Sequence, residues 1–206
     1  MSAVVRVHPA GARGVLIELA DGVPAAGAAA ALRAAFGQRL QDVVAGHATV
    51  LALGAAELPA TADLIGAIEA RPVAPDAVDL PLVELNVVYD GEDLADLAGT
   101  ISMDAAELSQ LHAAGEFRVA FLGMGGFPYL VGGDPRLTGV ARRATPRTRV
   151  RAGSVAVAAG YTGIYPRATP GGWWLIGHTD AVVFDPARAA PALLTTGQRV
   201  RLRSVG

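Results

Sequence analysis

The second half of the sequence consists of short apolar runs that glycine and proline interrupt at close intervals. Downstream of Gly123 these runs include SVAVAAG, WWLIG and AVVFD, each followed by residues typical of turns. Many short strands joined by Gly/Pro turns are typical of a β-sandwich or β-barrel. We therefore predict a β-barrel or sandwich for this part of the chain.

The first 80 residues alternate between strand and helix patterns, which predicts a small α+β domain. Pro24 is expected at a first helical position and Thr61 at an N-cap. Strands are predicted over residues 4–11, 13–20 and 47–54, and helices over residues 24–40 and 61–70.

A Pro- and Asp-rich stretch without periodicity, residues 71–81, predicts a linker. We therefore expect an α+β domain at residues 1–80 and a second domain at residues 81–206. The second domain begins with two further predicted strands and two helices, for which Asp90 and Ser102 are the expected N-caps. These strands cover residues 82–90 and 117–123, and the helices cover residues 90–99 and 102–115.

The composition excludes several kinds of chemistry. The chain has no cysteine, which removes disulfides and thiolate sites, and its 17 basic residues are all arginine. Without lysine there is no Schiff-base lysine and no complete P-loop. We find no run of about 18 uncharged apolar residues and no signal-peptide pattern, so we expect no membrane segment and a cytoplasmic protein.

The charges are unevenly distributed along the chain. Residues 1–120 contain six arginines and sixteen acids, whereas residues 121–206 contain eleven arginines and three acids. This asymmetry predicts an anionic ligand or an acidic partner for the second half. Nucleic acid is disfavoured, because the net charge is −2 and no aromatic residues are interleaved with the basic ones.

A loop rich in arginine, glycine and proline, residues 125–150, is the first candidate site. Arginine pairs bidentately with phosphate or carboxylate, glycine permits close backbone approach, and proline stiffens the loop. In the alternative interpretation, these arginines pair with acids of the first half or of another protein chain. The candidate binding residues in this loop are Gly125, Gly126, Phe127, Pro128, Tyr129, Asp134, Arg136, Arg142 and Arg147, with Arg143 as a candidate catalytic residue.

A second candidate region, residues 160–179, offers the hydroxyls of Thr162 and Tyr165 near two tryptophans. His112 lies near the end of a predicted helix that begins with acids, which is expected to favour its charged form. It is either a cap or a catalytic group. The four histidines are far apart and lack zinc-ligand spacing, so we predict no metal site.

These motifs together resemble a known family. GFPYL, GDPRL, RRATPRTRV, AGSVAVA, TGIYP and PGGWWLIG, with LHAAGEFRVAFLG before and ALLTTGQRVR after, are similar to the family of KipI and the B component of 5-oxoprolinase, also called allophanate hydrolase subunit 1. The strong part covers residues 82–206. The sequence departs from the family pattern at Gly125, Gly133, Ala113 and Tyr161, among others.

The resemblance implies a cyclophilin-like β-barrel after the small α+β domain, and an enzyme that works in a heteromeric complex. The expected partner is a KipA-type protein, the C component of 5-oxoprolinase, and a LamB/YcsF-type protein, the A component, is the expected third member. The implied reaction opens 5-oxo-L-proline to L-glutamate with ATP and Mg²⁺. Two alternatives stay open: a KipI-like inhibitor of a sensor histidine kinase, and a component of an allophanate hydrolase or urea carboxylase-type carboxyltransferase.

The resemblance also implies roles for individual residues. Arg142, Arg143 and Arg147 are expected to neutralise phosphate or carboxylate. His112 is expected to supply or orient a proton for lactam opening. The backbone amides of Gly125 and Gly126 are expected to hold an oxyanion.

Overall fold

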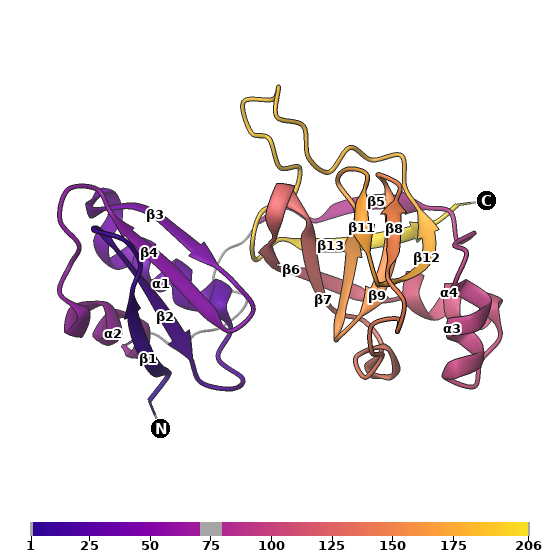
Figure 1. Cartoon of the computed structure of the whole chain (residues 1–206), viewed down its shortest axis with the longest axis horizontal. Helices are drawn as coiled ribbons and strands as arrows, with labels where there is room; N and C mark the ends of the chain where they lie inside the picture. The colour runs from indigo at the N-terminus through magenta and orange to yellow at the C-terminus, as the bar shows by residue number, and fades with distance from the viewer. Residues whose placement is uncertain (1, 71–79, 206) are drawn as a thin grey trace. The chain divides into compact units, whose positions relative to one another are not determined.

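The structure, a computed structural model, describes residues 2–70 and 80–205. The chain divides into two compact units, residues 1–79 and 80–206, and each has its own sheet (Figure 1). Most of the predicted linker, residues 71–79, lies outside the described residues. Within the described ranges, no helix combines the length and apolarity that crossing a membrane requires.

The first unit is a four-stranded antiparallel sheet in the order β1-β2-β4-β3 with two helices packed against it (Figure 1). Ile17 and Val50 of the sheet and Leu32 and Ile68 of the helices are fully buried, so they form the core of this layer. Its elements are β1 (Val4–Pro9), β2 (Gly14–Leu19), α1 (Ala25–Phe36), the 3-10 turn η1 (Gly37–Arg39), β3 (Leu40–Ala45), β4 (Thr49–Gly54) and α2 (Thr61–Glu69).

Local details of this unit differ from the sequence-based expectations. The first helix ends at Phe36 rather than at residue 40, because Gly37 takes a positive φ of 48° and begins a 3-10 turn. The next residues form β3, a strand that was not predicted. Pro24 is the N-cap rather than the first helical residue. Thr61 is the first residue of α2, after Ala60 at the N-cap, so the cap prediction was wrong.

The second unit is a mixed sheet that nearly closes into a barrel. Its seven strands follow the order β12-β9-β10-β7-β6-β13-β5. Val88, just after β5, exchanges two backbone hydrogen bonds of 2.9 Å with His178 at the end of β12, and this bridge joins the two edge strands. The α+β class with a barrel-like second part is therefore confirmed.

Two helices lie on one side of the barrel, and a two-stranded ribbon of β8 and β11 lies on another side (Figure 1). The elements of this unit are β5 (Val83–Val87), α3 (Leu94–Thr100), α4 (Ala105–Ala113), β6 (Glu116–Leu122), η2 (Met124–Gly126), β7 (Pro128–Gly132), η3 (Pro135–Leu137), β8 (Arg147–Val150), β9 (Ser154–Ala158), β10 (Tyr161–Ile164), β11 (Thr169–Gly171), β12 (Trp174–His178) and β13 (Arg199–Ser204).

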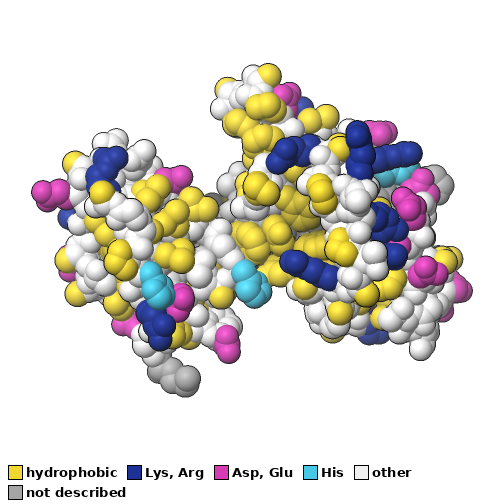
Figure 2. Space-filling view, viewed as in Figure 1, with side chains coloured by type: hydrophobic (Ala, Val, Ile, Leu, Met, Phe, Trp, Pro, Cys, Tyr) yellow, Lys and Arg dark blue, Asp and Glu magenta, His cyan; other side chains and the backbone are white. Residues whose placement is uncertain are grey.

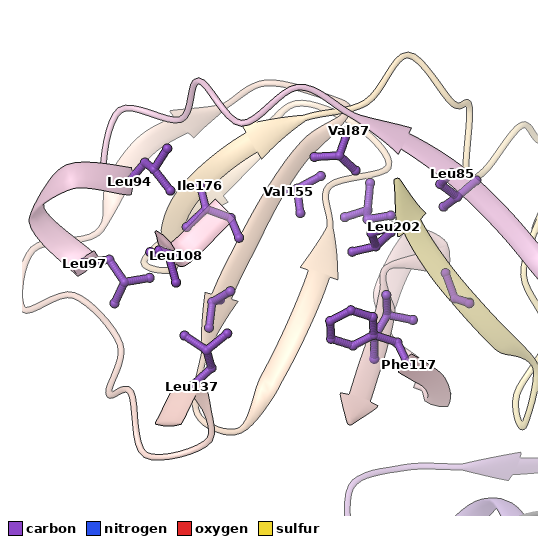
Figure 3. Close-up of a cluster of buried hydrophobic side chains, with 14 of the residues drawn as sticks. Leu85, Val87, Leu94, Leu97, Leu108, Phe117, Leu137, Val155, Ile176 and Leu202 are labelled. Carbon is purple, nitrogen blue, oxygen red and sulfur yellow. The ribbon is translucent and has the colours of Figure 1, made fainter. Parts of the chain in front are cut away.

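Strand β9 shows how the sequence builds two buried layers. All five of its residues are buried, and their side chains alternate between the two faces. Val155 and Val157 join the barrel core shown in Figure 3. Ala156 and Ala158 belong to a separate buried cluster with Tyr165 and other aromatic rings. The small alanine side chains leave room for those rings on the second face.

The helices α3 and α4 contribute Leu94, Leu97 and Leu108 to the barrel core (Figure 3). Their predicted caps were wrong. Asp93, not Asp90, is the N-cap of α3. Asp104, not Ser102, begins α4 through a capping box, in which Asp104 and Glu107 each accept the other's backbone N–H at 2.8 and 2.9 Å.

Candidate functional site

Two of the candidate arginines bind a buried carboxylate. Asp93 is 2% exposed, and both nitrogens Nη1 and Nη2 of Arg147 donate to its oxygens at 2.8 Å. Arg143 donates to the same carboxylate. The backbone N–H of Leu175 completes the set at 2.8 Å. This group of residues, which we call the Asp93 cluster, ties the start of α3 to the ribbon strand β8 and to β12.

The Asp93 cluster therefore corresponds to the alternative interpretation, in which arginines after residue 121 pair with acids among residues 1–120. Arg143 also stacks over the ring of Trp174, with its Cζ 5.1 Å from the ring centre. Its Nε is buried without a hydrogen-bond partner among the described residues. Both guanidinium groups are thus held by the protein itself, which favours a structural role.

His112 is completely buried inside the second unit. Its Nδ1 lies 2.8 Å from the hydroxyl of Tyr89, and its Nε2 lies 2.9 Å from the hydroxyl of Thr162. Burial lowers the pKa of His112 to about 3, because the interior disfavours the imidazolium. Burial also raises the pKa of Tyr89.

The expectation that His112 is charged was therefore wrong. Desolvation outweighs the favourable effect of the helix C-terminus. A neutral imidazole that bridges two hydroxyls orients Tyr89 and Thr162, but it lacks the second, acidic proton that an imidazolium could transfer near neutral pH. Thr162 accordingly lies in this interior network.

The predicted site residues Asp134, Arg136 and Gly126 take part in hydrogen bonds within local turns. Asp134 accepts from the backbone N–H of Arg136 at 2.9 Å and from its Nε at 2.8 Å, so the two residues stabilise the turn η3. This pairing lowers the pKa of Asp134 to about 2. The N–H of Gly126 donates to the carbonyl of Gly123 at 3.1 Å. That amide is already bonded, which argues against its predicted oxyanion role.

A layer of aromatic rings covers part of the outer surface of the barrel. Phe121 and Tyr129 stack with their centres 4.2 Å apart. Phe127 meets Tyr165 and Trp173 edge-to-face at 5.1 and 5.3 Å, which are favourable separations for aromatic pairs. In Figure 2, apolar side chains gather over β6 and β7, the strands that supply Phe121 and Tyr129.

A pocket of about 180 Å³ opens within this aromatic layer. We call it the aromatic pocket. One cation, Arg167, lines it, and the hydroxyls of Tyr129 and Tyr165 are the phenol groups of its wall. Burial raises the pKa of Tyr165, so its hydroxyl stays protonated at neutral pH. The lining residues are Met124, Phe127, Tyr129, Tyr165, Pro166, Arg167, Thr169, Pro170 and Trp173.

Glycine is required where backbone and side chains approach closely at this pocket. A Cβ on Gly163 would overlap the ring of Phe127 and come within 2.9 Å of Trp173. Gly125 has a φ of 68°, which favours glycine, and a Cβ there would come within 3.1 Å of the Nε of Arg167. The turn before β7 thus positions Arg167 at the rim of the pocket.

The structure brings only part of the predicted site together. Phe127, Tyr129 and Tyr165 line the aromatic pocket, Gly125 and Gly126 form the turn beside it, and Pro128 is the buried start of β7. Arg142 is exposed, whereas Arg143 and Arg147 belong to the Asp93 cluster.

Sequence reasoning missed Arg167 and Trp173 as pocket residues. The available signal was an arginine in YPRATPGGWW, isolated between two prolines and among aromatic residues. A lone cation in an aromatic segment is a candidate ligand contact, but only the folded structure shows that it faces the turn at Gly125.

The chain also matches a known family of proteins. Residues 5–194 match the model of the carboxyltransferase domain, subdomain C and D. The chain belongs to this family. The resemblance noted in the sequence is therefore confirmed over both units of the structure.

Curated relatives align with a little over half of this chain. Proteins named as the B subunit of 5-oxoprolinase are 48% identical over 123 residues in Escherichia coli O157:H7 and 40% identical over 128 residues in Bacillus subtilis. These alignments cover 58% and 60% of this chain. The chain spans about half the length of the curated relatives it matches, 56% and 53% respectively.

Solved structures share the fold over nearly the whole chain. The protein TTHA0988 is 34% identical with a TM-score of 0.77, and the match covers 94% of this chain but 40% of that one. PH0987 from Pyrococcus horikoshii is 27% identical with a TM-score of 0.59 and 97% coverage of both chains. The urea carboxylase of Kluyveromyces lactis, at 17% identity and a TM-score of 0.67, shows the fold alone; the match covers 100% of this chain and 23% of that one.

Proposed function

We propose that this chain is the B component of an ATP-dependent 5-oxoprolinase, which opens 5-oxo-L-proline to L-glutamate. The observation that carries the proposal is the 40–48% identity to three curated proteins that bear this name. The two alternatives, a kinase inhibitor and an allophanate-hydrolysing protein, have less support. None of the three curated proteins is named as either, and no feature of the described residues favours either of them over this reaction.

The aromatic pocket is the proposed site for the cyclic amide. Its walls suit a small, flat lactam ring, and Arg167 is the cation that would pair with the substrate carboxylate. The protonated hydroxyl of Tyr165 would donate a hydrogen bond to the lactam carbonyl. A site built to bond a polar ring in this way rejects analogues that lack those groups.

Two of the three arginines expected to neutralise phosphate or carboxylate do not fit that role. Arg143 and Arg147 are already paired with Asp93, and rotating them towards a phosphate would leave a buried carboxylate unpaired. In the described ranges, no three His, Asp or Glu side chains gather as metal ligands. We therefore derive no step through ATP or Mg²⁺ from the Asp93 cluster.

Other proteins would supply what this chain lacks. The proposed partners are a KipA-type protein, the C component, and a LamB/YcsF-type protein, the A component. The coverage of TTHA0988 supports the need for further protein, because a fold like this one makes up 40% of that longer chain. The proposal places this complex in the cytoplasm.

Co-expression with KipA-type and LamB/YcsF-type partners tests the proposal. The expected result is a stable heteromer on size-exclusion chromatography with light scattering, whose ATP hydrolysis rises when 5-oxo-L-proline is added. A heteromer whose ATP hydrolysis responds to allophanate or urea, and not to 5-oxo-L-proline, would reassign the substrate.

A further inference from the structure

A second cleft, of about 580 Å³, lies in the barrel unit and shares no lining residue with the aromatic pocket. Its volume is within the range of small-molecule sites, about 300–1,000 Å³. It is bordered by the end of β8, the loop after β5 and the end of β12. We call it the β8 cleft. Its charged lining residues are Asp90, Glu92, Arg149, Arg151, His178 and Asp180.

Half of these charged groups already have partners. The Nδ1 of His178 lies 2.8 Å from the carboxylate of Asp90. Glu92 lies 3.4 Å from Arg147, which belongs to the Asp93 cluster. These contacts reduce the number of charges that a ligand could meet in the cleft.

Three charged groups are left: Arg149, Arg151 and Asp180. All three are exposed, and the described part of the chain offers none of them an ion pair or a side-chain hydrogen bond. Val150 between the two arginines is 1% exposed and packs with the aromatic cluster, so both arginines stay on the side away from it. Arg149 is in β8 and Arg151 directly follows its last residue. Two residues of extended chain span about 7 Å, which separates the two arginines enough to take two anionic groups.

We propose that the β8 cleft binds an acidic amino acid. Two free guanidinium groups and one free carboxylate complement two carboxylates and one ammonium group. Arginine pairs bidentately with each ligand carboxylate, and Asp180 receives the ammonium group. A polyphosphate would leave Asp180 opposite like charge, which disfavours it. The site is independent of the proposed reaction, although L-glutamate, the expected product, has this chemistry.

Isothermal titration calorimetry on the full chain tests this site with three probes: L-glutamate, glutarate and inorganic pyrophosphate. Glutarate has both carboxylates of glutamate but no ammonium group. We expect L-glutamate to bind, and Arg149→Gln or Arg151→Gln to weaken it by about tenfold or more, because each variant removes a charge-assisted contact. Asp180→Asn should weaken the binding of L-glutamate and leave the affinity for glutarate unchanged or higher.

Arg188→Gln is the matched control, because Arg188 is exposed outside the cleft and pairs with Asp185. It should bind L-glutamate like the wild type. The proposal is overturned if L-glutamate does not bind at millimolar concentration, if the cleft variants bind it as well as the control does, or if pyrophosphate alone binds through the two arginines. Circular dichroism of each variant shows whether a loss of binding reflects unfolding.

Discussion

At the scale of single residues, burial decides which candidate groups are free to act. The sequence shows that arginines are abundant after residue 121 and that His112 ends a helix. It does not show that Asp93, about 50 residues earlier, forms ion pairs with Arg143 and Arg147. Nor does it show that His112 faces the interior. Aromatic residues were easier to place, because Phe127 and Tyr165 occur in motifs that predict a site.

Titration of His112 makes the free energy of unfolding depend on pH. The unfolded chain takes up a proton near the ordinary histidine pKa of 6.5, whereas the folded chain does so only near 3. The unfolded state therefore binds more protons in this interval, and stability falls as the pH drops, by up to about 1.4 kcal/mol per unit.

We expect His112→Gln to remove this part of the slope between about pH 6 and pH 4. Urea unfolding of both proteins at several pH values measures it, since the carboxylates contribute equally to both curves. If the two proteins lose stability in parallel as the pH falls, His112 is not held neutral by burial.

Loss of the carboxylate at Asp93 should be far more damaging than loss of an exposed one. Asp93→Asn leaves two partly buried guanidinium groups without their counter-charge, and breaking a buried pair costs about 3–5 kcal/mol. Thermal unfolding followed by circular dichroism measures the loss. Asp134→Asn, which breaks an exposed pair with Arg136, is the control and should melt close to the wild type. Equal melting temperatures for the two variants would contradict the structural role of the Asp93 cluster.

At the scale of elements, periodicity predicted most helices and strands, but it did not predict where they end. The strand β3 was missed because the predicted helix was extended past Gly37 to residue 40, and no element was assigned between there and the strand predicted from residue 47. The caps of α3 and α4 were misplaced because two capping candidates precede each helix, Asp90 and Asp93 for α3 and Ser102 and Asp104 for α4, and only backbone geometry selects Asp93 and Asp104.

The capping box of α4 provides a direct check. Asp104→Ala removes the side chain that accepts from the N–H of Glu107, and loss of an N-cap typically costs about 1 kcal/mol. Ser102→Ala, at the position first expected to be the cap, should cost much less. Chemical denaturation compares the two variants; a larger loss for Ser102→Ala would mean that α4 begins earlier than Asp104.

The aromatic layer depends on the absence of a side chain at Gly163. Gly163→Ala would place a methyl group in the ring of Phe127, and such overpacking costs about 1–3 kcal/mol. Gly139→Ala is the control, since a Cβ at Gly139 meets nothing within 4 Å. We expect a lower unfolding midpoint and altered near-ultraviolet circular dichroism for Gly163→Ala alone. Unchanged aromatic signals would contradict the packing described for the pocket.

At the scale of the whole molecule, the barrel was predictable because a change in pattern at Gly123 marks it in the sequence. Its near-closure was not, because the bridge between Val88 and His178 joins residues that no local pattern connects. The candidate site of the second unit is likewise assembled from β7, β11 and the turns around Gly125 and Arg167. Such assembly of distant segments is a property of the fold rather than of any one motif.

The aromatic pocket, in our proposal, holds 5-oxo-L-proline through Arg167. The most direct measurement is the KM for 5-oxo-L-proline in the reconstituted complex, followed by release of L-glutamate, for the wild type and for Arg167→Gln. We predict a KM at least about tenfold higher for Arg167→Gln, with the KM for ATP unchanged, because one charge-assisted contact to the substrate is lost. Arg188→Gln should match the wild type. An unchanged KM for 5-oxo-L-proline in Arg167→Gln would contradict the assignment of this pocket.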